Sequence, residues 1–223
     1  MTALAFDPTL YLVTDPRLCR AHGVVRTVRE GLEGGVTAVQ LRDKLSDKRT
    51  VYETALALKP ILQGSNVPLI INDHVDIAMA AGADGVHVGQ TDLPAETVRS
   101  LVGPDMILGV SAHHEAELKR IDPAVIDYVG LGPLWATATK PDAAAALGVE
   151  RARALRALTP APVVAIGGIT VEQAHEAMTA HVDGIAVVSA ICGQKDPRAA
   201  AHGLRRAVDE ARKRQNAWPG RRH

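Results

Sequence analysis

The sequence predicts an α/β protein built as a single-domain (β/α)8 TIM barrel, and three observations support this fold class. Eight short apolar or β-branched runs alternate with segments rich in Ala, Leu, Glu and Arg. The chain has 223 residues without a low-complexity linker, a length that suits one such domain. Polar side chains collect directly after the apolar runs, which is where barrels of this class build their active sites.

Each apolar run is typical of a buried parallel strand. In chain order the expected strands are Leu10–Thr14, Ala38–Leu41, Leu69–Ile71, Gly85–Val88, Ile107–Val110, Tyr128–Leu131, Val163–Ile166 and Ile185–Val188. The segments between them are expected helices that cover the sheet, among them Lys48–Gln63, Glu115–Ile121, Val149–Leu158 and Val171–Ala180. Eight strand–helix units favour a closed barrel over an open sheet, which usually has fewer strands.

Glycine or another small residue marks the points where helices are expected to stop and strands to begin. Gly35-Val36-Thr37-Ala38 and Gly82-Ala83-Asp84-Gly85 share this lead-in to a buried strand, and Val182-Asp183-Gly184-Ile185 has a looser form of it. We expect one domain over residues 1–223, with a barrel core at about residues 10–214 and frayed ends. The basic residues around Arg212 are expected to form a solvated helix end rather than a binding arm.

Composition and charge narrow the classes of function. Lys plus Arg number 25 and Asp plus Glu number 25, and this balance argues against a nucleic-acid binder. No apolar run is long enough to cross a bilayer. Cys19 and Cys192 form no CxxC pattern, which is typical of a reduced setting. We therefore expect a cytoplasmic protein that takes small-molecule substrates rather than nucleic acids or membranes. Whether it assembles as a homo-oligomer is left open.

A polar trio closes the second expected strand. Val39 and Leu41 share one face of this strand, so Gln40, Arg42 and Lys44 share the other. We expect the apolar pair to pack on the helices and the trio to point inward at the mouth of the barrel.

The charge of Arg42 in that position has two interpretations. An inward arginine is costly to desolvate unless it meets an anion, which favours a phosphorylated substrate. The alternative is a structural ion pair with Asp43 or with another carboxylate of the barrel, since buried charges are usually paired.

Two carboxylates follow neighbouring strands and are the best candidates for a metal site. Asp73 comes after the third expected strand and Asp92 after the fourth. Carboxylates, together with water and substrate phosphates, are the usual ligands of Mg²⁺. The alternative is that each residue caps a helix, Asp73 one that begins near His74 and Asp92 one over residues 95–101.

A glycine pair after the seventh expected strand predicts a phosphate site. Gly167-Gly168-Ile169-Thr170 leads into a helix, with Thr170 and Gln173 spaced as a capping box. Glycines let backbone N–H groups approach a phosphate, and barrels often bind one after strands seven and eight. Val188 and Ser189 are expected to close the same site from strand eight.

The long segment after the sixth expected strand contains two hydroxyls and a cation. Thr137-Ala138-Thr139-Lys140 lies within residues 132–147. Loops of this length are often lids or binding elements, and the alternative is a solvated loop. His113 and His114 lack a metal-ligand spacing and His87 lies in a buried strand, so all three are expected to have structural or supporting roles.

Taken together, these segments resemble the thiamine phosphate synthase family. The segments that carry the resemblance are Gln40-Leu41-Arg42-Asp43-Lys44, Ile71-Asn72-Asp73, Gly85-Val86-His87-Val88-Gly89-Gln90-Thr91-Asp92-Leu93, Gly109-Val110-Ser111, Gly130-Leu131-Gly132-Pro133, Thr137-Ala138-Thr139-Lys140, Ala165-Ile166-Gly167-Gly168-Ile169 and Val187-Val188-Ser189-Ala190-Ile191. They follow in order over nearly the whole chain. Any one of them could be coincidence, whereas the set is specific.

The resemblance implies a transferase that joins 4-amino-2-methyl-5-hydroxymethylpyrimidine diphosphate to a thiazole phosphate, giving thiamine phosphate and pyrophosphate. The positions that match the pyrimidine diphosphate contacts are Gln40, Leu41, Arg42, Asp43, Lys44, Asn72, Ser111 and Lys140. Those that match the thiazole contacts are Thr137, Ala138, Thr139, Gly168, Val188 and Ser189, and the Mg²⁺ cofactor would fall to Asp73 and Asp92. The residues that would be catalytic are Arg42, Lys44, Ser111 and Lys140, since a dissociative loss of pyrophosphate needs charge neutralised on the leaving group.

One departure and two rivals accompany this resemblance. Ala136 stands where the family commonly has Pro, so we expect a more mobile loop. Thiazole tautomerase-like relatives share the barrel but tend to lack the paired Asp residues and have a His in the loop after strand six, where this chain has Pro133. Both features favour the synthase. The other rival, a non-catalytic barrel, would bind thiamine precursors without releasing pyrophosphate.

Overall fold

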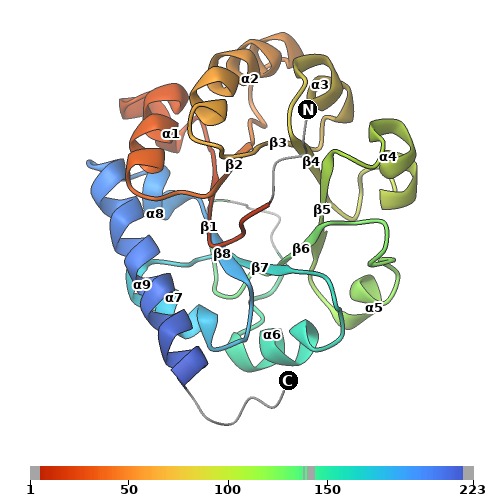
Figure 1. The fold of residues 1–223 in the computed structure, drawn as a ribbon, viewed down its shortest axis with the longest axis vertical. Coiled ribbons are helices and arrows are strands. Elements are labelled where there is room, and N and C mark those ends of the chain that lie inside the picture. Colours follow the sequence, from red (N-terminus) through yellow and green to blue (C-terminus); the bar gives the residue numbers. More distant parts are fainter. Residues whose placement is uncertain (1–5, 138, 140–143, 218–223) are drawn as a thin grey trace.

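The computed structural model describes residues 6–137, 139 and 144–217 and shows a closed barrel of parallel strands, which confirms the predicted fold (Figure 1). The strands are β1 (Leu10–Val13), β2 (Ala38–Leu41), β3 (Leu69–Asn72), β4 (Gly85–Val88), β5 (Ile107–Ala112), β6 (Tyr128–Leu131), β7 (Val163–Ile166) and β8 (Gly184–Val187). Each pairs with the next along the chain, and β8 pairs with β1 to close the sheet.

Helices surround the barrel on its outside (Figure 1). They are η1 (Leu18–Ala21), α1 (Val24–Glu33), α2 (Lys48–Gln63), α3 (Val75–Ala81), α4 (Ala95–Val102), α5 (Glu115–Leu118), α6 (Val149–Arg156), α7 (Val171–Met178), α8 (Ser189–Cys192) and α9 (Pro197–Ala217). The expected strand boundaries hold to within two residues, and the largest difference is β5, which continues through Ser111 and Ala112.

Strand alternation divides the buried side chains into two layers. Along β1, Leu10 and Leu12 pack in the layer between sheet and helices, whereas Tyr11 and Val13 point into the barrel. The inner layer is a small cluster of Tyr11, Val13, Ala38, Ile70, Ile107, Tyr128, Val164 and Ala186. The interior is therefore filled by side chains at its lower levels, so that a cavity can open only toward the carboxyl ends of the strands.

Aromatic packing closes the amino-terminal end of the barrel. The ring of Phe6 stacks on Tyr128 with centroids 4.3 Å apart and meets Tyr11 edge-on at 5.7 Å. The backbone before β1 crosses the same end so closely that a Cβ added at Gly184 would lie 1.6 Å from the carbonyl oxygen of Pro8. Phe6 and Pro8, which we expected to lie in a frayed terminus, thus form the floor of the barrel.

The basic end of α9 also differs from the expected solvated helix end. The guanidinium of Arg212 donates to the Thr9 hydroxyl at 2.6 Å and to the carbonyl of Asp183. These two contacts tie the last helix to the first segment and to the start of β8. Arg212 therefore has a structural role.

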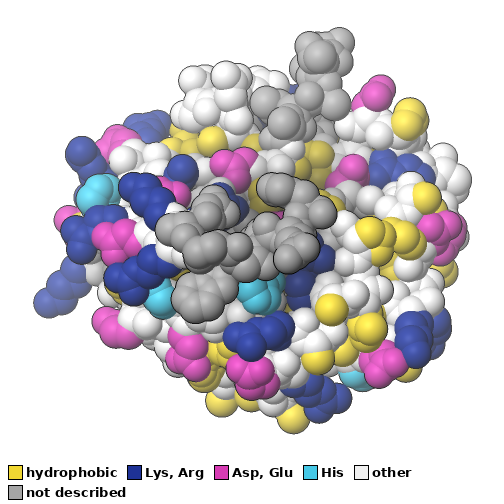
Figure 2. Space-filling view, turned by 60° about the horizontal axis from the view of Figure 1, so that its bottom comes forward, with side chains coloured by type: hydrophobic (Ala, Val, Ile, Leu, Met, Phe, Trp, Pro, Cys, Tyr) yellow, Lys and Arg dark blue, Asp and Glu magenta, His cyan; other side chains and the backbone are white. Residues whose placement is uncertain are grey.

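The sequence also led to expectations about surface charge, membrane-spanning helices and the two cysteines. On the face drawn in Figure 2, basic and acidic side chains are interspersed. No helix in the described ranges is long and apolar enough to cross a membrane. Cys19 and Cys192 are buried free thiols.

Candidate active site

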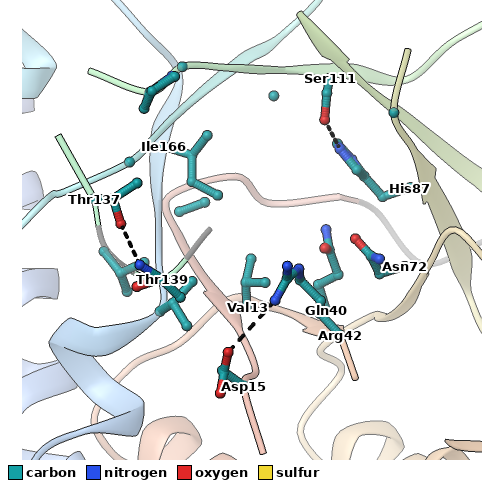
Figure 3. A pocket seen from close by; sticks show the side chains of 18 of the residues that line it. Val13, Asp15, Gln40, Arg42, Asn72, His87, Ser111, Thr137, Thr139 and Ile166 are labelled. Atoms are coloured by element: carbon teal, nitrogen blue, oxygen red, sulfur yellow. Dashed lines mark hydrogen bonds and ion pairs between the residues drawn. The ribbon is translucent and has the colours of Figure 1, made fainter. Parts of the chain in front are cut away.

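A cavity of about 720 Å³ opens at the carboxyl ends of the strands. Most of the predicted site residues line it, namely Gln40, Arg42, Lys44, Asn72, Asp73, Asp92, Ser111, Thr137, Thr139, Gly168, Val188 and Ser189. Figure 3 shows six of them from different strands and loops around the cavity, namely Gln40, Arg42, Asn72, Ser111, Thr137 and Thr139. Leu41 and Asp43 are not brought into the lining, and Ala138 and Lys140 lie outside the described residues. The cavity thus gathers residues that are far apart in the sequence.

The trio from β2 points inward, as strand periodicity predicts. Gln40 is buried and its Nε2 donates to the Tyr11 hydroxyl at 3.0 Å. Arg42 and Lys44 follow it on the same side, at the rim of the cavity. Leu41 packs in the outer layer instead. Neighbouring residues of a strand point to opposite faces, so Gln40 reaches the cavity and Leu41 the core.

Both cations of the trio have carboxylate partners. Arg42 Nη1 lies 3.7 Å from Asp15 Oδ2 (Figure 3), and Lys44 Nζ contacts Asp73 Oδ2. The structural ion pair that we considered for Arg42 is therefore present, but with Asp15 rather than Asp43. Asp43 instead accepts hydrogen bonds from two backbone N–H groups of its own turn.

Asp15 is a site residue that the sequence reasoning missed. Its carboxyl is almost fully buried and accepts from the backbone N–H groups of Arg17 at 2.9 Å and Leu18 at 3.2 Å. These bonds hold the carboxylate facing Arg42. Asp15 follows β1 directly, so the polar strand-end rule applied to the other strands would have found it.

Asp73 and Asp92 face the cavity and do not cap helices. The helices after them begin with His74 and Pro94 as N-caps, neither of which makes a side-chain cap, so the capping alternative is wrong. Asp73 has a left-handed backbone (φ 61°), a conformation that Asp tolerates better than most residues and that often marks functional sites. The backbone N–H of Gly89 donates to Asp92 Oδ2 at 2.7 Å.

Without a bound metal ion, the negative charges of Asp73 and Asp92 repel each other. Desolvation raises the pKa of Asp92, and the negative charge of Asp73 raises that pKa further. In the described part of the chain, no cluster of three or more His, Cys, Asp or Glu side chains could hold a metal ion. A metal at Asp73 and Asp92 would therefore take its other ligands from substrate or water.

Hydrogen bonds with His87 hold Ser111 in the cavity. Ser111 Oγ lies 2.8 Å from His87 Nε2, and His87 Nδ1 lies 2.9 Å from the Tyr128 hydroxyl (Figure 3). His87 is therefore part of the cavity wall. Tyr128, like Tyr11, is an inward polar group that the sequence reasoning passed over, although strand periodicity would have marked both.

The other two histidines have mainly local partners. His113 borders the cavity, and both its backbone N–H and its ring Nδ1 contact Glu117 Oε2, at 2.6 and 3.1 Å. His114 caps α5 by accepting from the backbone N–H of Glu117. Partial burial raises the pKa of Glu117, but the hydrogen bonds and charges of the two histidines outweigh it, so that this pKa is lowered.

On the opposite side, the turn after β7 is pressed against the loop after β6. Gly167 and Gly168 have left-handed backbones, with φ of 99° and 67°. A Cβ at Gly168 would lie 2.7 Å from the carbonyl oxygen of Ala136, and one at Gly167 would lie 2.3 Å from Pro133 Cβ. Only glycine fits both positions, by backbone angle and by space.

Helix starts lie next to this turn. Gln173 Oε1 accepts from the backbone N–H of Thr170 at 3.1 Å, one of the predicted capping contacts of α7. Val188 and Ser189, where α8 begins, line the cavity beside it. First-turn N–H groups have no partner inside a helix and can bind an anion. Thr137 Oγ1 accepts from the backbone N–H of Thr139 at 3.2 Å, a local contact in the loop after β6 (Figure 3).

The cavity therefore has two unlike sides. We call Arg42, Lys44, Asp73 and Asp92 the charged half, and Gly167, Gly168, Val188 and Ser189 the backbone half. The lining that β7, β8 and their following turns contribute in the described residues has no charged side chain.

Comparison with known proteins gives one consistent result. A model of the family described as thiamine monophosphate synthase matches residues 10–191. The thiamine-phosphate synthase of Xanthobacter autotrophicus is 49% identical over 207 residues, which are 93% of this chain and 98% of that protein. That of Azorhizobium caulinodans is 46% identical over 208 residues, with the same coverage of each chain.

Solved structures agree. Thiamine phosphate pyrophosphorylase from Pyrococcus furiosus superposes with a TM-score of 0.84 at 36% identity, covering 92% of this chain and 98% of its own. A 3-hexulose-6-phosphate synthase, at 17% identity and a TM-score of 0.60 over 89% of this chain and 99% of its own, shares the fold alone.

Proposed function

The chain belongs to the thiamine monophosphate synthase family, and from this premise we propose how its two-sided cavity divides the substrates. The protein is a transferase that condenses the pyrimidine and thiazole moieties in thiamine biosynthesis. The charged half binds the diphosphate of 4-amino-2-methyl-5-hydroxymethylpyrimidine diphosphate, and the backbone half binds the phosphate of the thiazole. The observation that carries this division is that, among the described residues, β7, β8 and the turns after them contribute no charged side chain to the cavity lining, whereas Arg42, Lys44, Asp73 and Asp92 line it after β2, β3 and β4.

On the charged half, the side chains neutralise a leaving group. The carbon–oxygen bond to the diphosphate breaks with its electron pair on pyrophosphate, and the thiazole nitrogen then gives its lone pair to the resulting pyrimidine methylene cation. Arg42 and Lys44 supply positive charge, and Ser111 supplies a hydroxyl donor, at the side where negative charge grows. Lys140, which lies outside the described residues, is proposed for the same task by its sequence position. Gln40 and Asn72 complete the proposed pyrimidine side, whereas Leu41 packs in the outer layer and Asp43 lies outside the cavity lining.

The donor set of the charged half fits Mg²⁺. Asp73 and Asp92 are close enough for the charge of one to raise the pKa of the other, and a divalent cation would relieve this repulsion. Two carboxylates leave coordination positions for substrate phosphate and water, which is how Mg²⁺ is commonly held. Bound there, Mg²⁺ would neutralise negative charge on the diphosphate. The Gly89 N–H holds the Asp92 carboxylate that would bind the cation.

On the backbone half, main-chain donors take the place of charged side chains. The turn at Gly168 and the start of α8 at Ser189 line the cavity, and main-chain N–H groups there would suit a phosphate monoester. Thr137, Ala138 and Thr139 are proposed to contact the thiazole ring, because they follow β6 between the two halves. Bringing both substrates into one cavity orients the thiazole nitrogen toward the reacting carbon.

The test is a product assay with metal control. Purified protein, both substrates and Mg²⁺ should give thiamine phosphate and pyrophosphate in equal amounts, EDTA should abolish turnover, and added Mg²⁺ should restore it. Undiminished activity in EDTA would overturn the metal assignment. Thiazole phosphate that still binds to Gly168→Ala with wild-type affinity would overturn the assignment of the backbone half.

A further inference from the structure

Five polar side chains form one continuous hydrogen-bonded chain across the barrel interior. Gln40 Nε2 donates to Tyr11 at 3.0 Å, and the Tyr11 and Tyr128 hydroxyl oxygens lie 2.8 Å apart. Tyr128 is 2.9 Å from His87 Nδ1, and His87 Nε2 is 2.8 Å from Ser111 Oγ. The chain therefore joins the side proposed for the pyrimidine ring to the side proposed for the leaving pyrophosphate.

The orientation of the Gln40 amide gives this chain a direction. Each phenol has one proton, and Tyr11 already accepts from Gln40. If Tyr128 donated to Tyr11, the buried Tyr11 proton would have no acceptor among the residues described. Leaving a buried donor unpaired is costly, so Tyr11 donates to Tyr128 and Tyr128 donates to His87 Nδ1.

The direction fixes the tautomer of His87. A neutral ring that accepts at Nδ1 carries its proton on Nε2, where it donates to Ser111 Oγ. The proton of Ser111 is then free to point into the cavity, toward an anion. At the other end, Gln40 turns its Nε2 to Tyr11 and keeps its carbonyl oxygen as an acceptor for substrate.

The packing around the chain is shaped to hold it. A Cβ at Gly109 would lie 2.1 Å from the Tyr128 ring, and one at Gly130 would lie 3.1 Å from His87 Cε1. These strand glycines make room for the two rings, although glycine weakens a strand. Burial raises the pKa of both Tyr11 and Tyr128, so each phenol keeps its proton.

We propose that Tyr11 and Tyr128 are positioning residues that select a 4-amino pyrimidine over its 4-oxo analogue and make Ser111 a donor to the leaving pyrophosphate. A 4-amino group needs an acceptor, which the fixed Gln40 carbonyl supplies. A 4-oxo group needs a donor, and presenting one requires the amide to flip and every bond of the chain to reverse. The selection rests on the proposed function, because it requires Gln40 to contact the pyrimidine.

The first test is spectroscopic and uses the free protein. Long-range ¹H–¹⁵N correlation spectra of protein labelled with ¹⁵N-histidine show which ring nitrogen carries the proton. We expect His87 to be the neutral Nε2–H tautomer in wild type and a mixture of tautomers in Tyr128→Phe. A neutral Nδ1–H tautomer in wild type would overturn the proposed direction.

The second test measures specificity by binding. Dissociation constants of the 4-amino and 4-oxo pyrimidine diphosphates are measured by calorimetry with wild type, Tyr11→Phe and Tyr128→Phe. Releasing the amide should lower the preference for the 4-amino ligand by about tenfold in Tyr11→Phe and by less in Tyr128→Phe. Tyr52→Phe is the matched control, since Tyr52 lies outside the barrel on α2, and it should keep the wild-type preference.

The outcomes distinguish a failure of the proposed selection from a failure of the proposed pyrimidine site. An unchanged preference in both Tyr11→Phe and Tyr128→Phe would overturn the selection. If neither pyrimidine diphosphate bound to the wild type, the proposed pyrimidine site would fail, and the selection with it. The His87 spectrum would still decide the direction of the chain, because it requires no ligand.

Discussion

The two halves of the cavity achieve anion binding by different physical means. The charged half relies on side chains that follow β2, β3 and β4, and its two cations already have carboxylate partners without substrate, Lys44 with Asp73 and Arg42 with Asp15 after β1. The backbone half relies on a glycine turn and a helix start, where the donors belong to the main chain. The comparison teaches that a site made of side chains is sensitive to lost charge, whereas a site made of backbone is sensitive to added volume.

The largest effect is expected from Asp92→Asn in the charged half. The amide keeps an oxygen for the Gly89 N–H but loses the charge that would hold Mg²⁺. We expect kcat to fall by about 10²–10³-fold, the size found when one transition-state electrostatic contact is removed. Steady-state pyrophosphate release against Mg²⁺ concentration measures it.

Asp105→Asn is the matched control for this change. Asp105 is an exposed residue between α4 and β5, at the other end of the barrel, and its substitution should leave kcat unchanged. Wild-type turnover by Asp92→Asn would remove Asp92 from the metal site. It would also show that the charged half depends less on side-chain charge than we infer.

Adding one methyl group should damage the backbone half. In Gly168→Ala the new Cβ meets the Ala136 carbonyl oxygen at 2.7 Å and the backbone is left-handed, so the turn must shift. We expect KM for the thiazole phosphate to rise by about tenfold, as for a weakened bond to a charged group, with little change in kcat. Gly103→Ala has similar backbone strain (φ 76°) with open space and no cavity contact, so it should lower stability without changing KM.

Removing a side chain from the backbone half should matter less. Ser189→Ala deletes a hydroxyl but keeps the N–H groups at the start of α8. We expect the dissociation constant of the thiazole phosphate to rise by less than about fivefold, the change that corresponds to the loss of one ordinary hydrogen bond. Isothermal titration with the thiazole phosphate measures it, and a loss as large as that of Gly168→Ala would show that this half also depends on side chains.

The smallest effect concerns pH and the carboxylate pair. The pKa of Asp92 is raised, so protons compete with Mg²⁺ at a higher pH than at an ordinary aspartate, and Mg²⁺ affinity should fall as pH decreases through that raised value. In metal-free protein, this carboxyl stabilises the fold below its unfolded pKa and loses that contribution as pH rises through the folded one. Urea unfolding in EDTA at neutral pH should therefore find Asp92→Asn slightly more stable than wild type.

Short-range patterns predicted much of this molecule, and contacts across the barrel were the part they missed. Strand periodicity placed Gln40 inside and Leu41 outside, because a two-residue repeat needs no knowledge of neighbours. It could not identify Asp15 as the partner of Arg42, since that pair depends on the register between β1 and β2. The same holds for the phenol pair of the interior, whose members are 117 residues apart.

Local pattern also could not decide between cap and cavity at the strand ends. A carboxylate before a helix fits both, and only the neighbouring Arg and Lys favoured the metal interpretation. The helix starts decide it, because the N-caps of α3 and α4 are His74 and Pro94 rather than the two aspartates.

The floor of the barrel has a consequence for how the chain is made. Thr9 leaves the ribosome long before Arg212, which is 203 residues later, and yet the two are hydrogen-bonded. Gly184, against which Pro8 packs, also emerges late. Contacts of such separation form slowly, and the first strand must wait for the last strand before the sheet can close. We therefore expect nascent chains that stop before β8 to remain open, with β1 unpaired along that edge.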